Sequence, residues 1–173
     1  MAEKEVLLQQ VMTEHTEKLF RIAYYYVRNT QTAEDIVQDV FIKFYHATTY
    51  IEQGKLEAYL TKMAVNKSKD YLRSWAYRKI QLRHTLKSVE VEIKDSLVQE
   101  DEELMIGEAI LKLPLKQREA IVYFYMEEMQ IKEIAGLLDI PESTVKSRLR
   151  KGKKQLGDIL KDVQWEVLLN GEA

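Results

Sequence analysis

The chain of 173 residues contains no cysteine, only two prolines and only six glycines. The absence of cysteine excludes a disulfide scaffold, a thiolate metal site and a cysteine nucleophile. Few helix breakers, with abundant Leu, Glu, Lys and Ala, predict an almost entirely helical protein. The longest apolar run, Ala120 to Met126, is too short to span a bilayer. The N-terminal segment has no apolar stretch typical of a signal peptide, so we expect a cytoplasmic protein.

Motifs that carry catalysis are also missing. The three histidines, His15, His46 and His84, are scattered, and there is no glycine-rich phosphate loop and no HExxH sequence. The adjacent acids Glu127 and Glu128 would point in different directions on a helix. The sequence therefore predicts a protein that is not an enzyme, with no catalytic residues, no metal site, no cofactor and no small-molecule substrate.

The charges nearly balance, at a formal net charge of −2, but they are strongly grouped along the chain. Residues 62–87 hold eight Lys or Arg against one acid, and residues 88–108 hold eight acids against one lysine. Residues 146–154 then hold six basic residues and no acid. This order predicts two cationic modules joined by an acidic segment, and the natural partner of such modules is a phosphate backbone. The alternative is an ordinary solvated surface.

Apolar residues recur at helical spacing in three segments of the first half: residues 5–29, Ala33–Ala47, and Leu56 to beyond Trp75. Thr32 and Asp35 resemble a capping box that opens the second of these helices. In the third, the spacing turns a set of side chains inward: Leu56, Tyr59, Leu60, Met63, Ala64 and Tyr71. We expect these helices to form one compact bundle within residues 1–83.

Residues 84–103 are expected to be a flexible acidic linker, and residues 104–173 a second small domain. If the 25 residues 84–108 were fully extended, they would span roughly 80 Å, enough to hold the two domains well apart. The expected fold class is all-α, with two small helical domains.

The second domain reads as a helix-turn-helix, with its turn at Asp139–Pro141 and a basic second helix. In such motifs the first residues of the second helix meet base edges in the major groove, and basic residues further along bind phosphate. Arg148 would be able to contact guanine with two hydrogen bonds. The alternative is an amphipathic surface helix with solvated lysines.

Two further groups of residues in the first domain attract attention. Basic and aromatic residues are interleaved between Tyr59 and Tyr77, a pattern suited to unpaired bases, although the aromatics may equally be core. The helix at 33–47 carries a polar face of Asp35, Gln38 and Asp39. Helix-dipole preference explains acids near its start but not Gln38, and spacing alone does not make this face a site.

The two halves together resemble one known family, the bacterial sigma-70 factors. Residues 33–45 read AEDIVQDVFIKFY and resemble region 2.2, and residues 58–74 read AYLTKMAVNKSKDYLRS and resemble regions 2.3 to 2.4. Residues 113–156 resemble region 4. The short linker, in place of a region 3 domain, is similar to the extracytoplasmic-function group. The resemblance runs from about His15 to Leu160.

The resemblance implies a factor that binds core RNA polymerase and directs it to promoter DNA. It assigns docking on the β′ clamp helices to Asp35, Gln38, Asp39 and Phe41. It assigns the −10 element to Asn66, Lys69, Asp70 and Arg73, with a flipped base held by the loop at 48–55. It assigns the −35 element to Ser143, Thr144, Lys146, Ser147, Arg148 and Lys151. It also implies docking of region 4 on the β flap, and an anti-sigma factor as a further partner.

The chain departs from the family pattern at two positions. Tyr59 stands where tryptophan is common, and Gly152 stands where alanine is common. A glycine inside a helix costs about 1 kcal/mol relative to alanine, so we expect Gly152 to loosen the second half of the recognition helix. The tail around Trp165 lies outside the motifs. We also expect the free chain to bind promoter DNA poorly, because the acidic linker competes with phosphate.

Two other functions compete with this interpretation. A helix-turn-helix regulator that acts without polymerase would use the same second domain, but it leaves residues 33–74 unexplained. A purely structural helical adaptor leaves the basic recognition helix unexplained.

Overall fold

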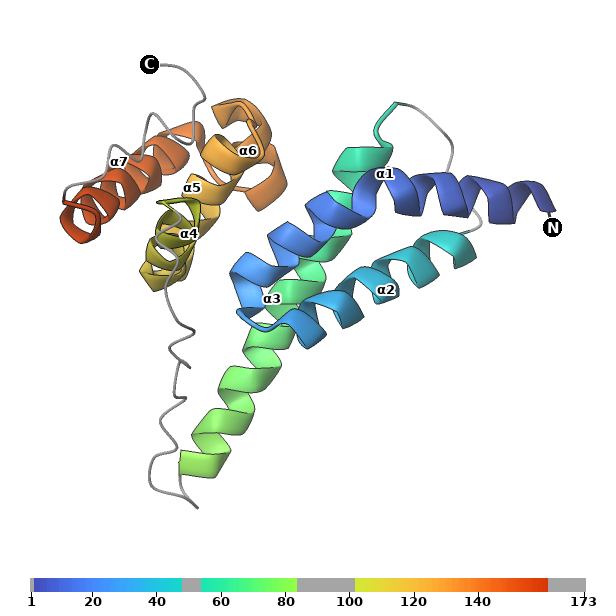
Figure 1. Cartoon of the computed structure of the whole chain (residues 1–173), viewed down its shortest axis with the longest axis horizontal. Coiled ribbons are helices and arrows are strands. Elements are labelled where there is room, and N and C mark those ends of the chain that lie inside the picture. Colours follow the sequence, from blue (N-terminus) through green and yellow to red (C-terminus); the bar gives the residue numbers. More distant parts are fainter. Residues whose placement is uncertain (1, 48–53, 84–101, 162–173) are drawn as a thin grey trace.

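The computed structural model describes residues 2–47, 54–83 and 102–161. These residues form helices joined by short turns, without a strand (Figure 1). The elements are α1 (Ala2–Val27), α2 (Thr30–His46), α3 (Leu56–Arg83), α4 (Glu102–Lys112), α5 (Leu115–Ile121), the π-helical turn η1 (Val122–Met126), α6 (Ile131–Leu138) and α7 (Glu142–Ile159). We call α1–α3 the first module and α4–α7 the second. The predicted all-α class with two helical domains is confirmed. The linker's flexibility stays a prediction, because residues 84–101 lie outside the described ranges.

The first module is a three-helix bundle in which α1 and α2 pack along α3 (Figure 1). Its core joins apolar residues of all three helices: Val11, Leu19, Val37, Val40, Phe41, Phe44, Leu60 and Ala64. On α2 the buried residues recur at spacings of three and four, which is the helical periodicity expected from the sequence. The opposite face of α2 is therefore free to carry polar residues.

Two local predictions in this module were wrong. The N-cap of α2 is Asn29, whose side-chain oxygen accepts a hydrogen bond from the backbone N–H of Thr32 at 2.9 Å. Thr32 thus lies inside the first turn rather than capping it. Tyr59 was expected to face inward but is 38% exposed. It precedes the buried Leu60, and the next residue in sequence lies about 100° around a helix.

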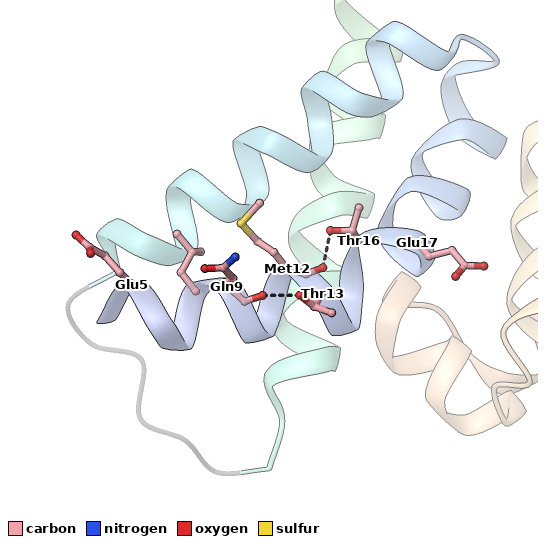
Figure 2. A pocket seen from close by; sticks show the side chains of 7 residues that line it. Glu5, Gln9, Met12, Thr13, Thr16 and Glu17 are labelled. Carbon is pink, nitrogen blue, oxygen red and sulfur yellow. Dashed lines mark hydrogen bonds between the residues drawn. The ribbon is translucent and has the colours of Figure 1, made fainter. Parts of the chain in front are cut away.

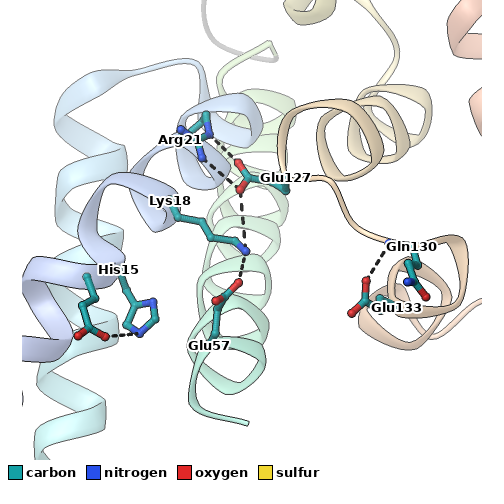
Figure 3. Close-up of polar contacts among 8 residues, drawn as sticks. His15, Lys18, Arg21, Glu57, Glu127, Gln130 and Glu133 are labelled. Atoms are coloured by element: carbon teal, nitrogen blue, oxygen red, sulfur yellow. Dashed lines mark hydrogen bonds and ion pairs between the residues drawn. The ribbon is translucent and has the colours of Figure 1, made fainter. Parts of the chain in front are cut away.

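The second module holds the predicted helix-turn-helix. Helix α6 ends at Asp139, whose left-handed backbone (φ 55°, ψ 50°) reverses the chain before α7 begins at Glu142. Aspartate tolerates this conformation better than most non-glycine residues. At the other end of α6, the Glu133 carboxylate accepts a hydrogen bond from the Gln130 backbone N–H at 2.8 Å (Figure 3). The turn at Asp139–Pro141 is confirmed.

Helix α5 runs directly into the π-helical turn η1, which the sequence did not predict. The backbone N–H of Glu127 donates to the Val122 carbonyl at 3.1 Å, and Glu128 adopts a positive φ of 52°. A π turn inserts one extra residue per turn and so changes the direction of the side chains that follow. The residue that follows the turn is Glu127, whose carboxylate is directed at the first module (Figure 3).

The two modules are packed against each other rather than held apart. In Figure 1, α1 and α3 of the first module face the second module. The largest apolar cluster crosses between them, joining Ile22, Tyr26 and Val65 of the first module to the core of the second. This contact brings residues far apart in the sequence into two buried polar clusters, one around Glu119 and one around Glu127.

Candidate functional site

The outer face of α2 is polar, with one large apolar side chain exposed among its polar residues. Asp35, Gln38 and Asp39 are all exposed, as their predicted role requires. Phe41, which was grouped with them, is only 4% exposed and packs in the core of the first module. Ile42 instead continues the outer face, at 56% exposure. The sequence pattern alone did not single it out, although its spacing of three and four from Asp39 and Gln38 places it on their face.

An ion pair links this face to the basic helix beside it. Lys67 of α3 contacts Asp39 of α2, with Nζ 2.7 Å from Oδ2, and both side chains are partly exposed. An exposed pair of this kind contributes little stability, about 0–1 kcal/mol. Asp39 and Lys67 can therefore exchange this contact for another partner at small cost.

The basic residues of α3 have two different environments. Asn66, Asp70 and Arg73 are exposed, and Arg73 donates to the Asp70 carboxylate at 2.9 Å. Lys69 instead turns toward the second module. Trp75 is 45% exposed and the ammonium of Lys79 lies 4.8 Å from its ring centroid. Of the loop at 48–55, predicted to hold a flipped base, residues 48–53 lie outside the described residues, as does the side chain of Tyr77.

Helix α7 presents a basic outer surface over a narrow apolar stripe. Val145, Leu149 and Leu156 are buried at helical spacing. Among the predicted −35 residues, Ser143, Lys146 and Lys151 are exposed, while Thr144 and Ser147 are half-buried. The outer surface is therefore polar at the helix start and cationic further along, as predicted.

Arg148 does not share this outer surface. Its side chain is 17% exposed, and Nη1 lies 3.7 Å from Oε1 of Glu119 on α5. Arg148 flanks the buried stripe, being one residue before Leu149. It is the one member of the predicted −35 set whose charged group is directed inward.

Glu119 is the centre of a buried polar cluster between the modules. Its side chain is 4% exposed and receives Nζ of Lys69 at 3.0 Å. The Tyr26 hydroxyl donates to the same carboxylate at 2.5 Å and lies 2.6 Å from the Tyr123 hydroxyl. Because Tyr26 has one proton, Tyr123 donates to Tyr26. Burial raises the pKa of both tyrosines, and the charge of Glu119 adds to the rise.

Glu127 forms a second cluster of the same kind (Figure 3). Its side chain is 2% exposed, and Arg21 of α1 donates to it through Nε at 2.6 Å and through Nη2 at 3.2 Å. This hydrogen bonding raises the pKa of Arg21. Lys18 lies 4.0 Å from Glu127 and also contacts Glu57 of α3. The adjacent Glu128 is exposed, so the two acids do point in different directions.

Cations also bind backbone carbonyls across the contact. Arg118 of α5 donates to the Tyr25 carbonyl at 2.9 Å and, within its own module, to the carbonyls of Leu111 and Leu113. Burial and the nearby Arg28 lower the pKa of Arg118 to about 10, which leaves it charged at neutral pH. Lys62 of α3 donates to the Leu137 carbonyl at 2.5 Å. The Tyr25 and Leu137 carbonyls each lie in the last turn of a helix, where backbone oxygens lack helical partners.

Gly152 is buried between α7 and α5, which changes its expected role. A Cβ at this position would lie 2.7 Å from Cγ1 of Ile121, closer than real contacts allow. Helix α7 continues through it to Ile159. The expectation that Gly152 loosens the recognition helix is therefore not supported, because the glycine allows the two helices to pack closely.

A groove of about 590 Å³ runs beside the N-terminal half of α1 (Figure 2). It is open and is bordered by Leu8, Met12 and polar side chains from Glu5 to Glu17. Within the described ranges no His, Asp or Glu cluster can hold a metal ion. Likewise, no helix in this part of the chain is long and apolar enough to cross a membrane. The groove holds none of the predicted site residues.

Comparison with known proteins gives the family. Residues 11–78 match the model of Sigma-70 region 2, and residues 103–156 match that of Sigma-70, region 4. The ECF RNA polymerase sigma factor SigW of Bacillus subtilis is 30% identical over 161 residues, which cover 86% of each chain.

Two solved structures share the fold. The sigma factor RpoE of Bartonella quintana, solved with the anti-sigma factor NepR, has a TM-score of 0.72 at 22% identity, covering 90% of this chain and 98% of its own. CnrH, solved with the cytosolic domain of CnrY, has a TM-score of 0.64 at 20% identity, covering 92% of this chain and 91% of its own. The family matches agree in order and position with the two modules, and the chain belongs to the extracytoplasmic-function group of sigma-70 family RNA polymerase sigma factors.

Proposed function

We propose that this sigma factor binds core RNA polymerase through the outer face of α2 and reads promoter DNA with α3 and α7. The observation that carries the proposal is that exposed polar and basic side chains lie on α2 and α3 of the first module and on α7 of the second. A protein of this family regulates transcription by recruiting the enzyme and does not itself catalyse a reaction. Because its partner acts on the chromosome, we place its action in the cytoplasm.

The polymerase contact consists of Asp35, Gln38, Asp39 and Ile42. An exposed isoleucine surrounded by polar groups is the composition of a binding hot spot, because the apolar centre loses water while the polar rim excludes it. Phe41 supports this face from behind, since it packs in the core under α2. The neighbouring charge pair with Lys67 can open when a partner competes for Asp39.

The −10 element is assigned to Asn66, Lys69, Asp70 and Arg73 on α3. Asn66 and Arg73 are exposed and suited to hydrogen bonds with bases and phosphates. The exposed ring of Trp75, on the same helix, can stack on an unpaired base. The ion pair with Asp70 holds Arg73 in position without burying it.

The −35 element is assigned to Ser143, Thr144, Lys146, Ser147, Arg148 and Lys151 on α7. Short polar side chains at the helix start can approach base edges, and Lys146 and Lys151 can bind phosphate. Arg148 joins this set only if its side chain leaves Glu119. We also extend to this chain an anti-sigma factor as partner, since RpoE of similar fold was solved with one.

Run-off transcription with core polymerase tests the proposal, and Ile42→Asp tests the docking face. We expect Ile42→Asp to lose co-elution with core by at least about tenfold, because a charge replaces the apolar centre. Ile159→Asp is the matched control, since Ile159 is exposed at the far end of α7, and it should bind core normally. No promoter-dependent transcript from the parent chain would refute the proposal. Specific promoter binding without core would favour the polymerase-independent regulator.

A further inference from the structure

The packing of the two modules brings a cation from each reading helix onto one carboxylate. Lys69 of α3 lies 3.0 Å from Glu119, and Arg148 of α7 lies 3.7 Å from the other oxygen of the same group. The side chains assigned to the −10 and −35 elements therefore meet within a few ångströms of each other. This juxtaposition defines what we call the closed arrangement.

The closed arrangement cannot place both helices on a promoter. Two elements 25 base pairs apart are separated by about 85 Å at 3.4 Å per base pair. Duplex DNA has a persistence length of about 150 base pairs, so bending a site this short back on itself is too costly. If α3 and α7 read the two elements at once, the modules must separate, and the ion pair between Lys69 and Glu119 must break.

The contact also includes a group that competes with DNA. A phosphate that binds the ammonium of Lys69 must compete with the Glu119 carboxylate. Glu127 pairs with Arg21 and Lys18 of α1, which are not assigned to DNA, and so holds the modules together without competing with it. Each of these carboxylates is nearly inaccessible in the closed arrangement and pairs with a cation of the other module, and Glu119 also lies near Arg148 of its own module.

Part of the remaining contact is polar and can be exchanged for water. Arg118 and Lys62 donate to the carbonyls of Tyr25 and Leu137, which lie in helix ends that water can solvate. The apolar part includes Ile22, Tyr26 and Val65 of the first module, and its burial favours the closed arrangement. Polar contacts of this kind are characteristic of interfaces between domains that move relative to each other.

We propose that Glu119 and Glu127 form an internal latch that holds the free sigma factor closed and occupies Lys69 in place of DNA. Core polymerase and promoter together release the latch by binding the separated modules. The competition with DNA rests on the assignment of Lys69 to the −10 element, whereas the closing of the modules does not. This latch replaces the acidic linker as the reason for weak DNA binding by the free chain.

The absence of cysteine makes the latch directly measurable, because two introduced cysteines are the sole labelling sites. Thr13→Cys on α1 and Asp158→Cys on α7 are exposed and lie outside the predicted binding faces. Spin labels at these sites report the distance between modules in the full chain. The test variant is Glu119→Gln with Glu127→Gln, and the control is Glu108→Gln with Glu128→Gln, which removes the same charge from exposed positions.

The latch predicts a longer and broader distance distribution in the test variant and an unchanged one in the control. It also predicts about tenfold tighter binding of the test variant, relative to the control, to a −10 DNA fragment, because apparent affinity rises with the open fraction. If the double variant does not fold, Glu127→Gln alone serves, since Glu127 touches neither Lys69 nor Arg148.

An unchanged distance in a folded variant would overturn the latch. If the test variant shows a longer distance but binds the −10 DNA fragment with the same affinity as the control variant, the competition for Lys69 is overturned. Both results are independent of run-off transcription, so a failure of the proposed function is seen separately as the absence of a transcript.

Discussion

The two helices assigned to promoter reading each direct one cation at Glu119, but the two contacts differ in kind. Arg148 and Glu119 belong to the same module, so their contact survives when the modules separate. Lys69 and Glu119 belong to different modules, so theirs does not. Opening of the modules therefore frees a cation on α3 while leaving Arg148 beside its carboxylate.

Arg118→Met should destabilise the chain by about 3 kcal/mol or more, because one carbonyl of the first module and two of the second lose their charged donor. Urea unfolding followed by circular dichroism measures the change. Arg150→Met is the control, since Arg150 is exposed on α7, and it should stay within about 0.5 kcal/mol of the parent chain. Equal stability of the two variants would show that Arg118 does not fasten the modules.

Gly152→Ala should destabilise the second module by about 1–3 kcal/mol, since its Cβ would overlap buried Ile121. Gly157→Ala, on the same helix, has no atom within 4 Å of the added Cβ and should stabilise by up to about 1 kcal/mol. Thermal unfolding distinguishes the two. If Gly152→Ala were stabilising as well, helix propensity rather than close packing would control α7.

Alkaline pH should loosen the contact through Tyr26 and Tyr123. Their folded pKa values lie above the unfolded value of about 10. Their stabilising contribution is therefore complete below pH 10 and is lost as the pH rises through the folded pKa values, at up to about 1.4 kcal/mol per pH unit for each tyrosine.

Urea midpoints at pH 9 and above pH 10 measure this loss, with Tyr26→Phe and Tyr123→Phe as controls that should reduce the pH dependence. Arg118 has a pKa lowered to about 10, so its own titration would raise stability over the same range. Only the difference between parent and phenylalanine variants isolates the tyrosines. An identical pH dependence in all three chains would contradict their role.

Lys151→Ala should weaken −35 DNA binding by about 1 kcal/mol at low salt and reduce the salt dependence by about one phosphate contact. Arg148→Ala should change the affinity less, because Arg148 is directed at Glu119 and not at the outer surface. Fluorescence anisotropy over a salt series measures both. A larger loss for Arg148→Ala, with relaxed base preference at one position, would show that Arg148 leaves Glu119 to read a base.

Much of the fold followed from the sequence because it depends on local periodicity. The apolar spacing on α2 and α7 and the turn at Asp139–Pro141 identified both modules. The contact between modules did not follow from it. A glutamate within an amphipathic helix, such as Glu119, reads as a surface residue until its partners on α1 and α3 are known. The close approach of Ile121 to Gly152 was invisible for the same reason, since both depend on contacts between distant segments.

The distance between the two modules can be measured directly. Spin labels at Thr13→Cys and Asp158→Cys in an otherwise unaltered chain give the distance before and after addition of core polymerase and promoter DNA. We predict one narrow distance distribution in the free chain and an increase of several tens of ångströms in the complex, as required by elements about 85 Å apart. An unchanged distance in a complex that produces a promoter-dependent transcript would contradict the account.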